Sequence, residues 1–370
     1  MKKFLSKLFA SVLVTLAVFG VAACGKSGGN TNGSSSDGSS SGGSGNGSLS
    51  GSSSSSSTIE LQKDAEIYMP DGAPALAMAK FMAEDMEDTD FHVVDATTIQ
   101  TYVTGANPKA DLCVMPLNAA VKLLGSGETY QMLGTVTHGN LYLISTDGNT
   151  VYDEPSDLSG LIGKKVGTIQ IQNVPGLTFK MILDKNDVPY QVIAANAEPA
   201  ADKVNLIAVA PADITPALGY DAYLIAEPAA SAKIKGTAST PKPFKLVGDL
   251  QKLYGGENGY PQAVLVGKTS FVQQNVQWVN SFLSQMPEAA SWLTAETTEI
   301  STIVSAVQEN LTEGMTPSFN AKNLTKAVIS GCGVRFTAAS ADKAEVLAYL
   351  GYLNESAGLN LTAADEFFYE

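Results

Sequence analysis

The chain has 370 residues, a formal net charge of −14, three cysteines and two histidines. So acidic a chain lacks the basic face that nucleic-acid binding requires, which argues against a nucleic-acid partner. The few histidines and cysteines also leave little capacity for a metal cluster or for nucleophilic catalysis.

The first 24 residues predict export. Lys2, Lys3 and Lys7 precede an apolar segment at 8–21, and small residues then lead to Cys24. The apolar segment is too short to span a bilayer, so the pattern is typical of a secretory signal. Its end resembles a bacterial lipobox, which implies a signal peptide over residues 1–23 and a lipid on Cys24. An ordinary signal peptide is the alternative.

Residues 24–58 predict a tether. After Cys24 they are Gly, Ser and Asn with almost no apolar side chain, so they cannot bury a core. As a flexible coil, such a segment reaches on the order of 30 Å. No later run is long enough for a membrane helix, so the lipid is the only anchor that we expect. About 310 residues remain, which is enough for two lobes.

The folded part opens with a strand, a tight turn and a helix start. Residues 67–69 form a β-type run, residues 70–72 are turn residues, and Pro74 begins a helix-forming apolar stretch. Free N–H groups and the helix dipole at such a start suit an anionic or carbonyl-bearing ligand. A plain connection in an α/β protein is the alternative.

Similar units recur along the chain. A strand at 110–115 leads through Pro116 to a helix at 119–124, and a strand at 165–169 leads through a loop to a helix at 177–183. Further strands are predicted at 91–94, 131–137, 141–144, 190–194, 203–208, 221–226, 244–247 and 260–266. From Phe271 onward the apolar spacing predicts helices.

Several polar residues carry two interpretations. Asn118 could cap a helix or face a ligand, and Glu227 could belong to a site at a strand end or begin a helix. His138 is expected to form a hydrogen bond at a strand corner, with ligand contact as the second role. Arg335, the only arginine, could clamp an anion or close an ion pair, which is the commoner role. The pair Cys113 and Cys332 could form a disulfide or remain two buried thiols.

No catalytic signature accompanies these units. The chain has no Gly-x-Ser-x-Gly elbow, no Walker loop, no Gly-x-Gly-x-x-Gly and no Cys/His cluster. We therefore expect a binding protein without a cofactor rather than an enzyme.

The motif order resembles that of a known family. The lipobox and tether precede Met69–Pro74, Val114–Asn118, Gly163–Gly167, Asp221–Pro228 and Tyr260–Val264. This order is similar to that of the substrate-binding lipoproteins of ABC importers, nearest to the nitrate/sulfonate/taurine and thiamine-precursor group. The resemblance implies an α/β, two-lobed type II periplasmic-binding-protein fold with two hinge crossings. Lobe 1 would hold residues 59–144 plus 263–370, and lobe 2 residues 145–262.

The resemblance also implies a function. The protein would capture a small anionic or heteroaromatic solute in the interlobe cleft and deliver it to an ABC permease, as a monomer anchored at the outer face of the bacterial cell membrane. The scarcity of cations near the loops argues against nitrate or sulfonate, and a neutral heteroaromatic such as a pyrimidine fits Glu227 and the aromatic content at least as well. The alternatives are a chorismate dehydratase-like enzyme on the same fold and a surface adhesin-type lipoprotein. The implied cleft residues are Asp71, Gly72, Ala73, Pro74, Pro116, Leu117, Asn118, His138, Gly139, Asn140, Asn173, Val174, Pro175, Gly176, Glu227 and Tyr260.

Overall fold

The computed structural model describes residues 61, 63–255 and 259–370. The predicted signal peptide (1–23), the lipidation residue Cys24 and the tether (24–58) lie outside the described residues. Within the described part of the chain, no helix combines the length and the apolar character needed to cross a membrane.

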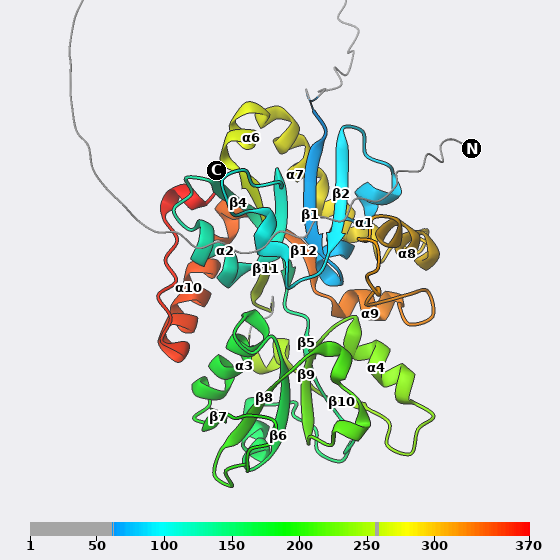
Figure 1. Cartoon of the computed structure of the whole chain (residues 1–370), viewed down its shortest axis with the longest axis vertical. Helices are drawn as coiled ribbons and strands as arrows, with labels where there is room; N and C mark the ends of the chain where they lie inside the picture. Colours follow the sequence, from blue (N-terminus) through cyan, green and yellow to red (C-terminus); the bar gives the residue numbers. More distant parts are fainter. Residues whose placement is uncertain (1–60, 62, 256–258) are drawn as a thin grey trace, which may run out of the picture. The chain divides into compact units, whose positions relative to one another are not determined.

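The first of two mixed sheets places several strand ends at one edge (Figure 1). β1 pairs in parallel with β2 and β3, while β11 runs antiparallel to β3 and β4, and β12 antiparallel to β4. The carboxyl ends of β1 to β4 therefore share an edge with the first residues of β11 and β12. The strand order is β12 (Val334–Ala338), β4 (Tyr130–His138), β11 (Pro261–Lys268), β3 (Leu112–Pro116), β1 (Ala65–Pro70) and β2 (Thr89–Val94).

The second sheet repeats this arrangement. β6 pairs in parallel with β8 and β9, and β8 with β7, while β5 runs antiparallel to β9 and β10. The carboxyl ends of β6, β8 and β9 thus share an edge with the start of β5. The strand order is β10 (Lys245–Asp249), β5 (Leu141–Ser145), β9 (Ala222–Ala226), β6 (Lys165–Ile169), β8 (Val204–Val209) and β7 (Tyr190–Val192).

The chain passes between the sheets twice. It leaves the first sheet after β4 and enters the second at β5, and it returns between Tyr254 and Pro261. The first crossing therefore lies at residues 139–140, earlier than the predicted 144, because Leu141 to Ile144 pair with Ala226 to Tyr223 of β9. Residues 261 and 262 belong to the first sheet, and not to the second lobe as predicted.

Helices cover both faces of the sheets. On one side of the first sheet, α1 packs against α7 and α8, and the Phe81 ring lies 4.8 Å from that of Phe282. A second core contains buried side chains from both sheets and from α2, α3, α5 and α10. The longer helices are α1 (Ala73–Ala83), α2 (Leu117–Leu124), α3 (Val174–Lys185), α4 (Ala229–Thr237), α7 (Val276–Trp292), α8 (Ile300–Glu309) and α10 (Ala339–Ala357).

Short elements complete the fold. The short α-helices are α5 (Leu250–Tyr254), α6 (Thr269–Gln274) and α9 (Lys326–Gly331). The 3₁₀ turns are η1 (Ile99–Tyr102), η2 (Pro155–Leu161), η3 (Pro211–Asp213), η4 (Pro216–Leu218) and η5 (Asp365–Phe367).

The prediction that the chain is helical from Phe271 onward missed strand β12. Gly333 has a φ of 62°, which favours glycine and ends the α9 segment. The following residues then pair with β4 as the edge strand of the sheet, with Val334 opposite Thr137. Of the two interpretations of the cysteines, the structure has the second, since Cys113 and Cys332 are both buried free thiols.

Candidate functional site

One pocket is lined by strand ends of both sheets. We call it the corner pocket; its volume is about 640 Å³, within the range of small-molecule sites. Residues of the first sheet reach it from the ends of β1 and β2, and residues of the second sheet from the ends of β6 and β8. The lining residues are Asp71, Asp95, Ala96, Thr97, Gln170, Ile171, Gln172, Asn173, Ala208, Val209, Ala210, Pro211, Met315 and Thr316.

Asp71 reaches the corner pocket from the turn between β1 and α1. One carboxylate oxygen, Oδ1, accepts the Gly72 backbone N–H at 2.7 Å, and Oδ2 accepts that of Ser318 at 2.6 Å. Gly72 has a φ of 101°, a conformation that favours glycine, so this turn needs glycine to aim Asp71. Burial raises the pKa of the Asp71 carboxyl, and the two backbone donors oppose that rise.

Asn173 reaches the same pocket from the second sheet. It precedes α3, where its backbone is extended and its side chain makes no capping hydrogen bond. Its N–H donates to the Gln170 carbonyl at 2.8 Å, which closes the turn after β6. Gly176 holds this turn against the helix, since a Cβ there would lie 2.4 Å from the Ile171 Cα. The backbone of this turn is thus fixed, while the Asn173 side chain makes no hydrogen bond to the helix start.

Other predicted site residues form what we call the crossing network, made of Asn140, Glu227, Ser231 and Gln262. The Asn140 Nδ2 donates to the Glu227 carbonyl at 3.1 Å, and its Oδ1 accepts from the Gln262 Nε2 at 2.5 Å. The Glu227 carboxylate accepts from the Ser231 N–H at 3.0 Å and from its hydroxyl at 2.6 Å. Glu227 therefore lies just before helix α4, which begins at Ala229, and is buried rather than solvated; burial raises the pKa of its carboxyl.

His138 and Gly139 line a different pocket of about 410 Å³ beside the first crossing, together with Arg335. The His138 Nε2 lies 3.1 Å from the Thr337 hydroxyl oxygen, which is the hydrogen bond at a strand corner that the sequence predicts. Burial, together with the positive charge of Arg335, lowers the pKa of His138 to about 3, so the ring is neutral at physiological pH.

Tyr260 is part of the core. Its ring is fully buried and stacks on that of Tyr349, with 5.9 Å between centroids and 9° between planes. Its hydroxyl donates to the Gln251 side-chain oxygen at 3.2 Å. A solute does not reach this ring in the described structure.

The remaining predicted residues lie in helix starts. Helix α2 begins one residue after Pro116, so Asn118 lies within the first turn and is not its N-cap. Asn118 is buried, and its Oδ1 has no hydrogen-bond partner among the described residues. Outside the corner-pocket lining lie Gly72, Ala73, Pro74, Pro116, Leu117, Asn118, Val174, Pro175 and Gly176.

Sequence reasoning missed most of the corner-pocket lining. Asp95 follows the predicted strand at 91–94 and Gln170 follows the strand at 165–169, so the strand-end rule could have found both. Met315 and Thr316 come from the loop between α8 and α9, and their sequence carries no signal of a site. Among the described residues, no group of three or more His, Cys, Asp or Glu could hold a metal ion.

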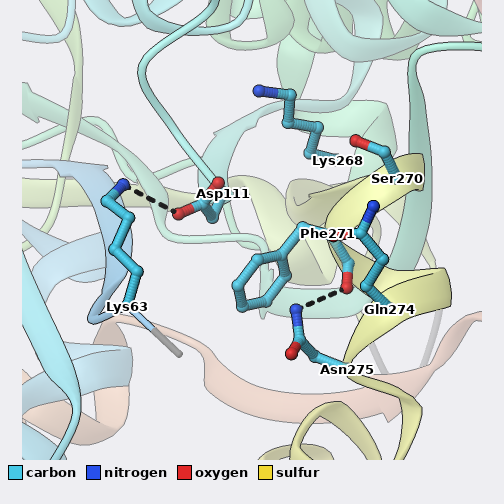
Figure 2. A pocket seen from close by; sticks show the side chains of 7 residues that line it. All are labelled: Lys63, Asp111, Lys268, Ser270, Phe271, Gln274 and Asn275. Atoms are coloured by element: carbon cyan, nitrogen blue, oxygen red, sulfur yellow. Dashed lines mark hydrogen bonds and ion pairs between the residues drawn. The ribbon is translucent and has the colours of Figure 1, made fainter. Parts of the chain in front are cut away.

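A larger pocket, of about 730 Å³, lies at the opposite edge of the first sheet (Figure 2). Lys63 precedes β1 and Asp111 precedes β3, and their side chains form an ion pair at 3.7 Å. This pocket is therefore at the amino ends of the parallel strands and holds none of the predicted site residues. Because sites of α/β sheets form at the carboxyl ends, we take the corner pocket as the candidate site.

Comparisons with solved structures identify the fold. An ABC transporter structure from Parabacteroides distasonis matches with a TM-score of 0.62 and 16% identity, covering 84% of this chain and 99% of that chain. The ligand-binding component of an ABC-type import system from Staphylococcus aureus, with zinc bound, matches with a TM-score of 0.54 and 12% identity, over 83% and 97%. The alkanesulfonate-binding protein SsuA from Xanthomonas axonopodis pv. citri, bound to MOPS, matches with a TM-score of 0.53 and 14% identity, over 84% and 99%.

The chain has the type II periplasmic-binding-protein fold. Its two six-stranded mixed sheets and two crossings are those that the resemblance implies, so the predicted fold is confirmed. At these identities the likeness shows the fold alone. No protein-family model matches the chain, and a search of curated proteins gave no match.

Proposed function

We propose that the chain is the extracytoplasmic solute-binding component of an ABC importer. In this proposal it captures a small solute at the corner pocket and delivers it to a membrane permease, while the lipid on Cys24 holds it at the outer face of the membrane. The solved structures with this fold are described as ABC-transporter and solute-binding proteins, which supports the proposal.

One observation carries it. Asp71 and Asn173 lie about a hundred residues apart, follow strands of different sheets, and line one pocket. A solute held between two lobes needs contacts from both, and loops that follow strands of both sheets supply them at this pocket. The number of separate lining segments favours binding by many weak contacts over chemistry at one activated group.

We further propose that each sheet with its helices is a lobe and that solute binding closes the lobes around the two crossings. The crossing network and the hydrogen bond between Tyr260 and Gln251 of α5 join the lobes near the crossings. The corner pocket lies at the ends of β1, β2, β6 and β8 and contains none of these contact residues. Rotation about the crossings would therefore change the pocket most and the crossings least.

A thermal-shift screen tests the proposal. We expect at least one solute from a panel of amines, amino acids, pyrimidines, sulfonates and nitrate to raise the melting temperature. A ligand that binds only the folded state at a hundred times its Kd adds about 2.7 kcal/mol of stability. Small-angle scattering with that solute should show smaller dimensions. A panel that leaves the melting temperature unchanged contradicts solute binding, and unchanged dimensions contradict closure.

A further inference from the structure

The corner pocket has carboxylates without cations. Asp71 and Asp95 both line it, and its lining contains no lysine, arginine or histidine. The Asp95 Oδ1 accepts both the N–H and the hydroxyl of Thr97, at 2.8 and 2.5 Å, and these bonds lower the pKa of Asp95. Its negative charge contributes to raising the pKa of Asp71. An anionic solute would be a third negative charge in this pocket and would add to the existing repulsion.

The start of helix α1, where an anion could bind, is already occupied by a negative charge of the protein. The N–H of Gly72, which precedes α1, donates to the Asp71 carboxylate at 2.7 Å. The Ser318 N–H is likewise directed at the same carboxylate, at 2.6 Å. Since Asp71 occupies these donors, an incoming sulfonate or nitrate would meet a carboxylate and not free N–H groups.

Neutral amides and aliphatic groups line the rest of the pocket. The side chains of Gln170, Gln172 and Asn173 supply amide groups, whose oxygens accept and whose NH2 groups donate hydrogen bonds, and Ile171, Val209 and Met315 supply apolar surface. The lining contains no aromatic side chain. A heteroaromatic ring or a quaternary ammonium group, both of which favour aromatic partners, would lack that contact here. Groups with several N–H donors match carboxylate and amide oxygens better.

We infer that the corner pocket takes a solute with a primary ammonium or guanidinium group on an aliphatic body. This inference rests on the proposed function and names the class of its solute. The cationic head lies toward Asp71 and Asp95, and the aliphatic body lies against Ile171, Val209 and Met315. The pocket thereby differs in charge preference from a site that binds an alkanesulfonate.

Matched probes of opposite charge test the inference. Butylamine and butylguanidine share their alkyl chain with butanesulfonate, so only the charged head differs. We expect isothermal titration calorimetry of the purified chain to show binding of both cations, with butanesulfonate and nitrate at least tenfold weaker. Tighter binding of butanesulfonate or nitrate overturns the inference and leaves the proposed function standing.

Two variants then locate the cationic head. Asp95→Asn keeps an oxygen that can accept from Thr97 and removes the charge, and we expect it to weaken butylguanidine binding about tenfold. Asp153→Asn, at an exposed position outside the pocket, is the matched control and should change affinity less than twofold. Equal affinities of the two variants overturn the assignment of Asp95.

The wider thermal-shift panel separates the two proposals. If a larger solute binds, a cationic aliphatic one supports the inference, and an anionic or aromatic one overturns it alone. If no probe and no panel member binds, the inference and the proposed function both fail.

Discussion

The amide side chains of the corner pocket and those of the crossing network are in opposite situations. In the crossing network, Asn140 hydrogen-bonds both Glu227 and Gln262, and Glu227 also holds Ser231. In the corner pocket, the Asn173 side chain makes no capping hydrogen bond, and no hydrogen bond of the described residues involves the side chain of Gln170 or Gln172.

This contrast separates structural from binding roles. A buried polar group whose bonds are made within the protein stabilises the fold, and breaking one bond leaves a costly unpaired partner. A fixed polar group without such a partner can hydrogen-bond a solute at little cost to the fold. Variants in the two regions should therefore separate stability from affinity.

Tyr260→Ala should give the largest effect, on stability alone. Removing a fully buried aromatic ring that stacks on Tyr349 should lower the free energy of unfolding by about 3–5 kcal/mol, measured by urea denaturation. Tyr352→Ala, at a ring that is 41% exposed, is the matched control and should cost far less. If Tyr260→Ala instead weakens solute binding and keeps stability, Tyr260 is a ligand contact and the contrast is wrong.

Glu227→Gln should give an intermediate effect that depends on pH. Burial raises the folded-state pKa of Glu227 above its ordinary value of 4.5. Its contribution to stability is then fully present below the unfolded pKa and is lost as pH rises through the raised folded pKa. The stability of the wild type relative to Glu227→Gln should therefore fall as the pH rises above about 4.5.

Urea denaturation across this pH range measures the Glu227 difference. Glu128→Gln, at an exposed position, supplies the baseline. A wild-type advantage that grows with pH would show that Glu227 is better stabilised as a carboxylate than its burial indicates.

Asn173→Ala should give the smallest effect on stability and a large one on affinity. Because its side chain makes no capping bond, we expect the free energy of unfolding to change by less than about 0.5 kcal/mol, while solute affinity falls about tenfold. Asp249→Ala is the control, since that carboxylate accepts from the N–H groups of Gln251 and Lys252 and its loss should cost about 1 kcal/mol. Equal destabilisation of both variants would mean that Asn173 caps α3 in solution.

The sequence predicted most strands correctly because the burial of a strand is encoded locally. The strand predicted at 165–169 coincides with β6, and the runs at 91–94 and 110–115 lie within about two residues of β2 and β3. Strand β12 escaped this reasoning because none of its residues is buried and its pairing partner, β4, is distant in the sequence.

The same distinction holds for the site. The strand-end rule selected Asp71 and Asn173, which share a pocket, but also Glu227, which does not line it. Strand order explains the difference, since β1 and β2 and likewise β6 and β8 are neighbours, while β9 lies nearer the crossings. Which strand ends face one pocket depends on this order, and the sequence near each strand does not contain it.

The sequence by itself determined the α/β class, the succession of strands and helices, and the candidate residues at strand ends. The tertiary structure decided the first crossing at residues 139–140 and the return of the chain between Tyr254 and Pro261, the enclosure of Tyr260 in the core, and the acidic lining of the corner pocket. The physical reason is that local periodicity reports whether a side chain is buried. Its partners are set by pairings between segments far apart in the chain.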